Sequence, residues 1–398
     1  MTSGGTATPA GSQSTSSPGG PPPHKKGLLG RVITRDNWPY ALVPMIPIAV
    51  VLELVHASAS IIFATSALGV IPTAALMGRA TEELAERAGP GIGGLLNVTF
   101  GNFPELLIAF FALLAGLQEV VKASIIGSIL GNILLVMGAA MFVGGLGRDR
   151  QTFNHRAAST QATMLILAAA AMAMPAVFQL VSGGGLPPLG VEDVQFSDSV
   201  EQLSLAVAIV LLLSYAGGLW FSLQPHRDLF NPADESGEDD EDGHEPWTVR
   251  RSVTLLAVAG LAVGLMSEIL VGSISETAEH VGISEFFIGV IIVAVVGNAA
   301  EHWVAVLVAA KDKMDLAVNI AIGSSTQIAL FVAPVLVLLS FVFGPGPLSL
   351  VFNGFELAAV FLAVIIATHI ARDGESTWFE GLQLLAVYAV LGLTFYFA

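Results

Sequence analysis

Two glutamates stand inside long apolar stretches of this 398-residue chain. Each ends a similar motif, Gly-Asn-Phe-Pro-Glu at 101–105 and Gly-Asn-Ala-Ala-Glu at 297–301. A charged side chain within a membrane-length apolar segment is costly and usually functional. Glu105 and Glu301 are therefore candidate site residues.

Spacing within the motif places several polar groups together. Asn102 lies three residues before Glu105 and Gly101 four before, so a helix would present all three on one face. Pro104 cannot donate a hydrogen bond to the carbonyl of Phe100, which predicts a local break that frees this oxygen. The second copy has Ala300 at the proline position, so any break there must depend on Gly297 alone.

The following apolar segments supply hydroxyls and amides. Ser124, Ser128 and Asn132 recur at spacing four after the first motif, and Ser324, Ser325 and Gln327 follow the second. Neutral oxygen ligands are one interpretation. Small residues that allow close helix packing are the other, and the sequence leaves both open for the serines.

Two carboxylates with amide, hydroxyl and carbonyl oxygens suit a hard cation. Ca²⁺ takes six to eight oxygens, and two negative charges balance its two positive ones. Without the cation, two facing carboxylates in a low dielectric cannot both stay ionised, so protons replace it. No Lys or Arg lies in either apolar run, so an empty, ionised site would cross a membrane only at high cost. These residues predict an exchanger of Ca²⁺ for protons.

The sequence leaves two interpretations open for His302 and two for the acidic stretch 79–87. His302, beside Glu301, either relays protons or is a packed, hydrogen-bonded imidazole. The stretch 79–87 carries Glu82, Glu83 and Glu86 on neighbouring helical turns. It is either an acidic cytoplasmic mouth that attracts Ca²⁺ or a solvated face with internal ion pairs.

A constant offset relates the two motifs. Adding 196 to residues 101, 102 and 105 gives 297, 298 and 301, and the same offset carries Gly127-Ser128 onto Gly323-Ser324. One offset over two segments predicts an internal duplication.

Composition identifies the class of protein. Hydrophobic residues make up 54% of the chain and charged residues 12%, against about a quarter charged in soluble domains. This predicts an all-α integral membrane protein in a lipid bilayer. There are no cysteines, which excludes disulfides and thiolate metal sites, and the net charge of −16 argues against nucleic-acid binding.

Eleven apolar segments have about the length of a spanning helix. They are 40–56, 58–78, 91–116, 119–146, 158–182, 201–223, 249–272, 284–310, 315–343, 349–371 and 376–397. With a cytoplasmic N-terminus, every Lys and Arg except Lys122 falls inside, which is 15 of 16. The helix with Glu105 is then third and runs outward, whereas the helix with Glu301 is eighth and runs inward. The two halves are therefore predicted to be inverted repeats, as in many secondary transporters.

These segments divide the chain into five parts. We expect a disordered cytoplasmic tail at 1–38, a first transmembrane helix at 39–57 and a first five-helix repeat at 58–224. An acidic cytoplasmic linker at 225–247 and a second five-helix repeat at 248–398 follow. The linker lacks the ligand order of a Ca²⁺-binding loop and reads as a solvated connector, with a cation-collecting or regulatory role as the alternative.

The motifs resemble those of the cation/proton exchanger family of Ca²⁺/H⁺ antiporters, within the Ca²⁺/cation antiporter superfamily. The resemblance rests on GNFPELLIAFFALLAG and VVKASIIGSILGNILLVMG in the first half and GNAAEHWVAVLVAAKDKMDLAVNIAIGSSTQIALF in the second. It implies eleven helices, one outside two five-helix repeats, and alternating access with Glu105 and Glu301 binding Ca²⁺ or protons. The neighbours it implies are Asn102, Asn298, Ser128, Ser324 and Gln327. Phe103-Pro104 departs from the family's usual small or aliphatic residues, which affects geometry rather than the ligand set.

Other functions fit the sequence less well. A Na⁺-driven exchanger of the same superfamily is the nearest alternative, because additional monovalent sites are compatible with the chain. An intramembrane metalloprotease would need an HExxH motif, which is absent, and paired titratable carboxylates favour exchange over a passive channel.

No enzyme activity or cofactor is predicted, only Ca²⁺ and H⁺ as transported substrates. We expect a prokaryotic plasma membrane, with a vacuolar membrane as the alternative, and a homo-oligomer is compatible with the sequence.

Overall fold

The computed structural model describes residues 38–188, 196–222 and 247–397. The predicted tail, up to residue 37, and the predicted linker, up to residue 246, lie outside the described residues. The rest of the chain from Pro39 forms one compact unit, and it is described below.

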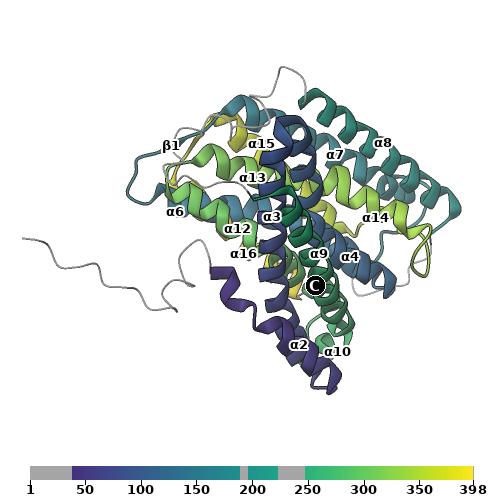
Figure 1. Cartoon of the computed structure of the whole chain (residues 1–398). Coiled ribbons are helices and arrows are strands. Elements are labelled where there is room, and N and C mark those ends of the chain that lie inside the picture. The colour runs from purple at the N-terminus through teal and green to yellow at the C-terminus, as the bar shows by residue number, and fades with distance from the viewer. Residues whose placement is uncertain (1–37, 189–195, 223–246, 398) are drawn as a thin grey trace, which may run out of the picture. The chain divides into compact units, whose positions relative to one another are not determined.

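The described chain is almost entirely helical (Figure 1). Its first half contains η1 (Trp38–Leu42), α2 (Met45–Leu54), α3 (Ala59–Gly101), α4 (Phe103–Leu114), α5 (Gln118–Leu130), η2 (Gly131–Val136), α6 (Met137–Gly145), α7 (His155–Val181) and α8 (Asp198–Ser222). Its second half contains α9 (Val249–Gly272), α10 (Ile274–Val281), α11 (Glu285–Phe287), η5 (Ile288–Val293), α12 (Ala294–Ala310), α13 (Met314–Gln327), η6 (Ile328–Val332), α14 (Ala333–Ser340), α15 (Gly354–Asp373) and α16 (Trp378–Phe397). Within the described residues, the only strands are β1 (Gln151–Thr152) and β2 (Glu375–Ser376), which pair antiparallel.

Length and hydropathy support the membrane class. Nine helices in the described part of the chain are long and apolar enough to span a bilayer, and two shorter apolar helices cover Trp38–Leu54 and Phe103–Leu114. The chain is therefore a helical, multi-pass membrane protein. The total of eleven spans stays a prediction.

The second and third predicted spans differ from the structure. They were placed at 58–78 and 91–116 with an amphipathic stretch between them. The helix from Ala59 instead continues through this stretch as far as Gly89, and a second helical segment, grouped with it as α3, runs on to Gly101. The two segments are separated at Gly89, where φ is 78° and ψ is 169°, a non-helical conformation that only glycine adopts readily. Helix α10 was also not predicted. It is short, and its amphipathic pattern pairs buried Ile274 and Ala278 with exposed Glu276 and Glu279.

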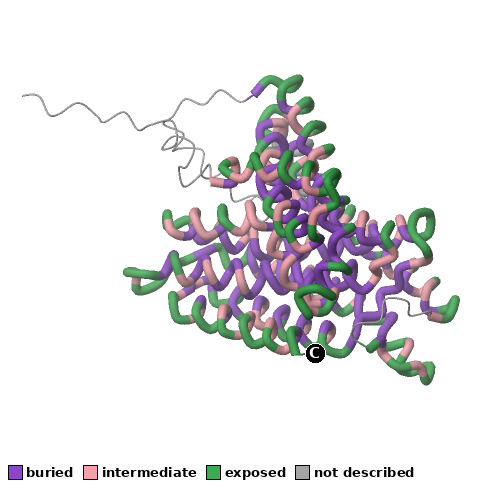
Figure 2. Tube along the Cα trace, turned by 90° about the horizontal axis from the view of Figure 1, so that it is seen from below, coloured by how far each residue is buried: buried purple, intermediate pink, exposed green. Residues whose placement is uncertain are grey.

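Helices α2, α3 and α9 form one group. Helix α3 packs along α9 and against α2. Figure 1 shows α3 and α9 side by side, crossing the direction of α6, α12 and α13. The buried residues concentrate where these groups meet, while exposed residues follow the outer sides of the helices (Figure 2).

One set of loops gathers at the end of the molecule that we call the basic face, defined by Arg148, Arg150, Lys311 and Lys313. The β1–β2 pair joins two of these loops. Arg150 forms a 2.9 Å ion pair with Glu375. Arg148 lies 3.6 Å from Asp312, which also accepts a 2.8 Å hydrogen bond from Gln151 Nε2. These contacts bring together loops that the predicted crossings place on one side.

Lys122, the exception to the predicted charge bias, is buried rather than in a loop. Only 7% of it is exposed. Its Nζ donates to the carbonyl of Val351 at 3.3 Å and lies 6.0 Å from the centre of the Phe196 ring. Because the positive-inside rule concerns charges in loops, a lysine buried among protein groups does not contradict it.

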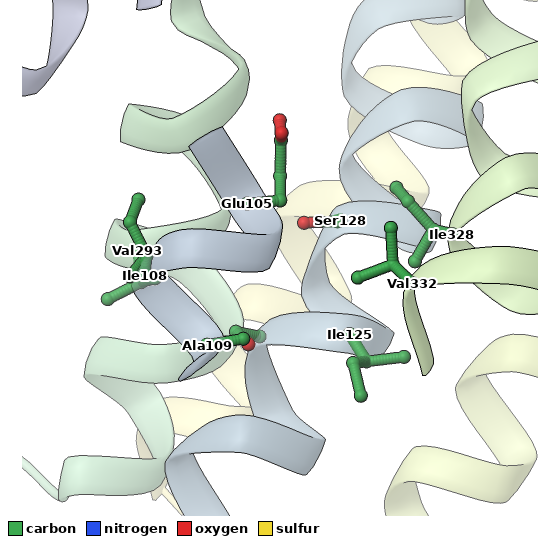
Figure 3. Close-up of a pocket in the computed structure, with 9 residues that line it drawn as sticks. Glu105, Ile108, Ala109, Ile125, Ser128, Val293, Ile328 and Val332 are labelled. Carbon is green, nitrogen blue, oxygen red and sulfur yellow. The ribbon is translucent and has the colours of Figure 1, made fainter. Parts of the chain in front are cut away.

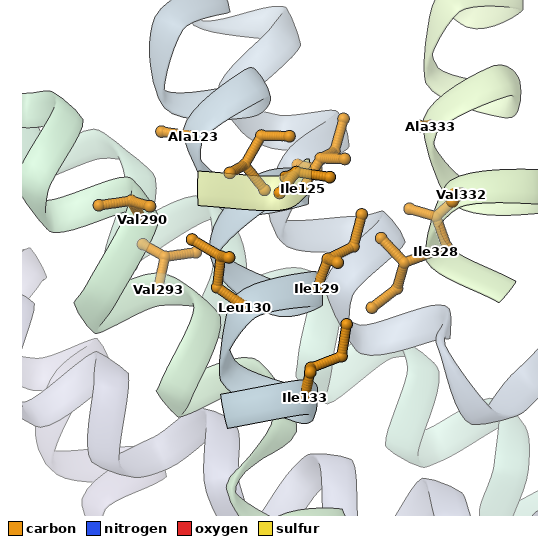
Figure 4. Close-up of a cluster of buried hydrophobic side chains, with 14 of the residues drawn as sticks. Ala123, Ile125, Ile129, Leu130, Ile133, Val290, Val293, Ile328, Val332 and Ala333 are labelled. Atoms are coloured by element: carbon orange, nitrogen blue, oxygen red, sulfur yellow. The ribbon is translucent and has the colours of Figure 1, made fainter. Parts of the chain in front are cut away.

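Close backbone contact holds α5 against the π-helical turn η5. A Cβ built on Gly127 would lie 2.1 Å from the carbonyl oxygen of Val290. Figure 4 shows the apolar layer around this contact, with Ile125, Ile129 and Ile133 on one side and Ile328 and Val332 on another. The absence of a side chain at position 127 therefore sets the helix spacing.

We predict that Gly127→Ala destabilises the fold. The added methyl group must displace the η5 backbone, and overpacking of this kind costs about 1–3 kcal/mol. The apparent unfolding temperature of the purified protein in detergent should fall by several degrees. Gly217→Ala on α8 is the control, because nothing lies within 4 Å of a Cβ at that position. Equal unfolding temperatures for the two variants would contradict the packing argument.

Candidate cation site

The first motif contains the predicted backbone break. Helix α3 ends at Gly101 and α4 begins at Phe103, with Pro104 in its first turn. Between them, Asn102 has φ of −96° and ψ of 17°. The carbonyl of Phe100, which was expected to be free, accepts a hydrogen bond from the Asn102 N–H. The break places Glu105 in the first turn of α4.

The second motif is continuous. Helix α12 runs from Ala294 through Gly297 and Glu301 to Ala310, as expected where alanine replaces the proline. Its irregularity lies earlier, in the π-helical turn η5. Such turns are rare and frequently occur near functional sites.

Each motif glycine faces the glutamate of the other motif. A Cβ built on Gly101 would lie 3.7 Å from Oε1 of Glu301, and one built on Gly297 would lie 3.8 Å from Oε1 of Glu105. The charge of Glu301 acts on Glu105. The two ion pairs among the described residues, Arg148–Asp312 and Arg150–Glu375, do not involve these glutamates. The structure therefore brings both predicted carboxylates into one site without a basic partner.

The predicted amides and hydroxyls surround these carboxylates. Asn102 donates through Nδ2 to Gln327 Oε1. Asn298 Nδ2 donates to Ser128 Oγ at 3.3 Å and to the carbonyl of Ala294 at 3.0 Å. Ser324 Oγ donates to Glu301 Oε2 at 3.1 Å. The Asn102–Gln327 and Asn298–Ser128 bonds join the two halves of the chain, and the Ser324–Glu301 bond joins α13 to α12.

Three buried oxygens at the site accept no hydrogen bond within the described part of the chain. They are Oδ1 of Asn102, Oδ1 of Asn298 and Oε2 of Glu105. Both amide nitrogens are already used as donors, so the amides present their oxygens to the site. Buried acceptors without donors are unusual, and carboxylate and amide oxygens are the ligands that Ca²⁺ prefers.

A small cavity adjoins Glu105. Ser124, Ser128, Ile125, Ile328 and Val332 contribute to its lining, and it has room for a water-sized particle. Figure 3 shows Glu105 and Ser128 at one end, with Ala109 and Ile125 toward the other. The cavity therefore has a polar end beside the carboxylate, and Ser124 is the one polar residue in the rest of its mostly apolar lining.

Three other predicted hydrogen-bonding residues lie around this site. His302 Nε2 is 3.1 Å from Asn132 Oδ1, so the imidazole is hydrogen-bonded between α12 and η2, and a proton relay stays a prediction. Ser325 Oγ donates to the carbonyl of Ala321 at 2.9 Å and lies 3.5 Å from that of Ile129. Positions 129 and 325 differ by the repeat offset of 196, so each half contributes the same position to this contact.

The three glutamates of the acidic stretch 79–87 differ in exposure. Glu82 and Glu86 are exposed. Glu83 is instead buried and accepts a 2.7 Å hydrogen bond from the N–H of Trp247. Its inclusion in a solvated acidic mouth is therefore corrected, because the helix turns this carboxylate toward the start of the second half.

Sequence reasoning missed both Trp247 and an amide pair. Arg87 Nε donates to the Trp247 carbonyl at 2.6 Å, and the guanidinium of Arg251 lies 4.2 Å from the centre of its ring. Gln161 on α7 donates to Asn319 on α13. A glutamine within an otherwise apolar helix was the available signal for this pair.

Comparison with known proteins identifies the family. The family described as sodium/calcium exchanger protein matches residues 58–224 and 251–397. The chain belongs to this family. A Ca(2+)/H(+) antiporter of Aphanothece halophytica is 45% identical over 376 residues, which cover 92% of this chain and 98% of the relative. The Ca(2+)/H(+) antiporter ChaA of Bacillus subtilis (strain 168) is 44% identical, with 88% and 96% covered.

A solved structure has the same fold as this family member. Native YfkE superposes with a TM-score of 0.75 at 41% sequence identity, covering 90% of this chain and 100% of that one. The match extends over the whole helical unit rather than a single motif. The helices that carry both motifs therefore belong to a shared fold.

We predict that Ser324→Ala weakens equilibrium Ca²⁺ binding to this exchanger-family chain. The substitution removes the donor that orients Glu301, and hydrogen bonds to charged groups contribute about 1.5–3 kcal/mol, which corresponds to roughly tenfold or more in affinity. Radioactive Ca²⁺ binding to purified protein measures the effect. Ser325→Ala is the matched control, since that hydroxyl contacts backbone carbonyls. Equal affinities for the two variants would contradict the assigned role of Ser324.

Proposed function

We propose that this chain exchanges Ca²⁺ for H⁺ across a membrane, with Glu105 and Glu301 binding Ca²⁺ or protons in turn. The observation that carries the proposal is that each glutamate lies beside the glycine of the other motif, near buried oxygens and, within the described residues, without an ion pair. Two carboxylates balance one Ca²⁺, whereas their mutual repulsion without it favours proton uptake. The names of the relatives from Aphanothece halophytica and Bacillus subtilis support the same exchange.

Alternating access between inverted repeats would move this site from one side to the other. The reciprocal contacts of Gly101 and Gly297, and the contact of Ser325 with Ile129, support two equivalent halves around the site. The π-helical turns η2 and η6 occur at positions related by the same offset. In this proposal, α3 and α9 move against the remaining helices, one extra helix precedes the repeats, and the basic face is cytoplasmic.

The cellular membrane and assembly belong to the proposal as well. The bacterial relative supports a prokaryotic plasma membrane, and a vacuolar calcium ion transporter of Schizosaccharomyces pombe, 37% identical, supports the vacuolar alternative. Ca²⁺ and H⁺ are the proposed substrates and the lipid bilayer the proposed surroundings. Homo-oligomer formation would be measured by light scattering in detergent.

Exchange driven by Na⁺ is the second candidate, because the family description includes sodium/calcium exchangers. Radioactive Ca²⁺ uptake into proteoliposomes separates the two functions. An imposed pH gradient should drive uptake in the absence of Na⁺. Uptake that ignores the pH gradient and follows a Na⁺ gradient would instead establish the second candidate.

We predict that Glu105→Gln and Glu301→Gln each abolish pH-driven Ca²⁺ uptake. Each amide keeps the size of the carboxyl group but supplies no negative charge and takes up no proton. Size-exclusion profiles and unfolding temperatures should stay near those of the unmodified protein. Glu53→Gln, which changes an exposed carboxylate, should transport normally. Transport by either site variant would remove that residue from the mechanism.

Ca²⁺ binding should release protons. At a pH where the glutamates carry protons, Ca²⁺ must displace them, so binding should weaken as the pH falls. A pH indicator in weakly buffered detergent solution measures the protons released per bound Ca²⁺. If Ca²⁺ binds without releasing protons at any pH from roughly 5 to 8, where buried carboxylates can take up protons, Ca²⁺ binding is separate from proton exchange.

A further inference from the structure

An amide pair lies between the basic face and the central glutamates. Gln161 belongs to the second turn of α7, and Asn319 to the second turn of α13. Gln161 Nε2 donates to Asn319 Oδ1, and Thr326 Oγ1 donates to the Gln161 carbonyl at 3.3 Å. Only 7% of Gln161 is exposed, and its Oε1 accepts no hydrogen bond among the described residues.

Both amide oxygens converge beside Gly323. A Cβ built there would lie 3.6 Å from Gln161 Oε1 and 3.6 Å from Asn319 Oδ1. The missing side chain therefore leaves space between two oxygens that belong to different helices. An oxygen without a donor, aimed at this space, is the arrangement expected of a ligand position.

This space lies on a polar row of α13 that leads to the central site. Asn319, Gly323 and Gln327 follow one another at spacing four and are each partly exposed, unlike most of their neighbours on α13. Gln327 accepts the hydrogen bond from Asn102. On the adjacent turn, Ser324 donates to Glu301. Amide oxygens thus extend from the second turn of α13 to the glutamates.

The opposite end of the protein lacks this row. Subtracting 196 from 319 and 323 gives Ala123 and Gly127, both buried, and Gly127 is closed off by the Val290 carbonyl. Asn154 caps α7, and Gln161 lies seven residues after it. Asn353 caps α15, and the residue seven positions after it is Val360. The equivalent positions are therefore apolar and tightly packed.

We propose that Gln161, Asn319 and the space at Gly323 form an access subsite for a partly hydrated Ca²⁺, on the route between the basic face and Glu105 and Glu301. This deepens the proposed function and rests on it. Neutral amide oxygens replace some of the water ligands of Ca²⁺, and bound water supplies the remainder. The subsite binds weakly because it carries no charge, which allows the cation to pass on to the glutamates.

The subsite serves one side of the membrane only. The positions equivalent to the subsite carry no amide, and α5 presents the Ser124 and Ser128 hydroxyls beside Glu105 instead. The two routes to the same glutamates therefore differ in chemistry. Substitutions in the subsite should therefore change the apparent affinity for Ca²⁺ offered at the basic face and leave the other direction unchanged.

Gly323→Ala is the sharpest test. Its methyl group occupies the space between the oxygens at an ordinary contact distance, so the Gln161–Asn319 hydrogen bond and the fold should be retained. The KM for Ca²⁺ presented at the basic face should rise about tenfold, the effect of losing one good ligand. Gln161→Leu, which removes one oxygen, should act in the same direction. Gly217→Ala is the control for adding a methyl group in a helix.

Initial rates are measured in membrane vesicles of both orientations. The chain has no cysteine, so Lys313→Cys in each background reports the exposed face through labelling by an impermeant maleimide. Equilibrium Ca²⁺ binding is measured in parallel and should be unchanged in Gly323→Ala but lost in Glu301→Gln.

Each outcome decides the proposal. A raised KM at the basic face alone, with unchanged equilibrium binding, supports the subsite. An unchanged KM in Gly323→Ala overturns it, and so does an equal rise at both faces, which would indicate damage to the central site. Absence of pH-driven transport by the unmodified chain would overturn the proposed function itself, a result that the control vesicles report separately.

Discussion

Two carboxylates that share an apolar interior without a basic partner constrain the whole structure. Their repulsion and the cost of desolvating them can be relieved by a divalent cation or by protons. A nearby lysine or arginine would relieve the same cost permanently and would remove the reason to exchange one ion for the other. Lys122, a lysine buried within the described helices, lies at the other end of α5, against Val351 and Phe196.

The helices meet this constraint through small residues and oriented amides. Gly101 and Gly297 let each glutamate approach the backbone of the other motif, and Gly127 lets α5 contact η5. Hydrogen bonds hold the amide nitrogens of Asn102 and Asn298, which turns their oxygens toward the site. Apolar residues make up most of the surroundings, so that few but well-placed polar groups control the chemistry.

The two halves share their central chemistry but differ around it. Pro104 breaks the first motif at Asn102, whereas α12 continues unbroken through the second. The proposed routes also differ, because amides follow α13, whereas α5 has alanine and glycine at the equivalent positions and presents the Ser124 and Ser128 hydroxyls. A transporter that works between compartments of different Ca²⁺ concentration needs one common site, and its two routes can carry different affinities. The duplication that the offset of 196 predicts would give the common site, and divergence of each half would give the different routes.

The sequence by itself determined the features that depend on local chemistry. Composition and segment length specify membrane helices, the offset of 196 relates the motifs, Pro104 forces a break, and a carboxylate in an apolar run marks each half of the site. Only the tertiary structure decided features that depend on distant partners. Glu83 turns inward because Trp247 is there to donate, the helix from Ala59 extends through the acidic stretch until Gly89 interrupts it, and Gln161 meets Asn319 only when α7 packs on α13. A spacing along the chain contains no information about such partners, since helices far apart in sequence supply them.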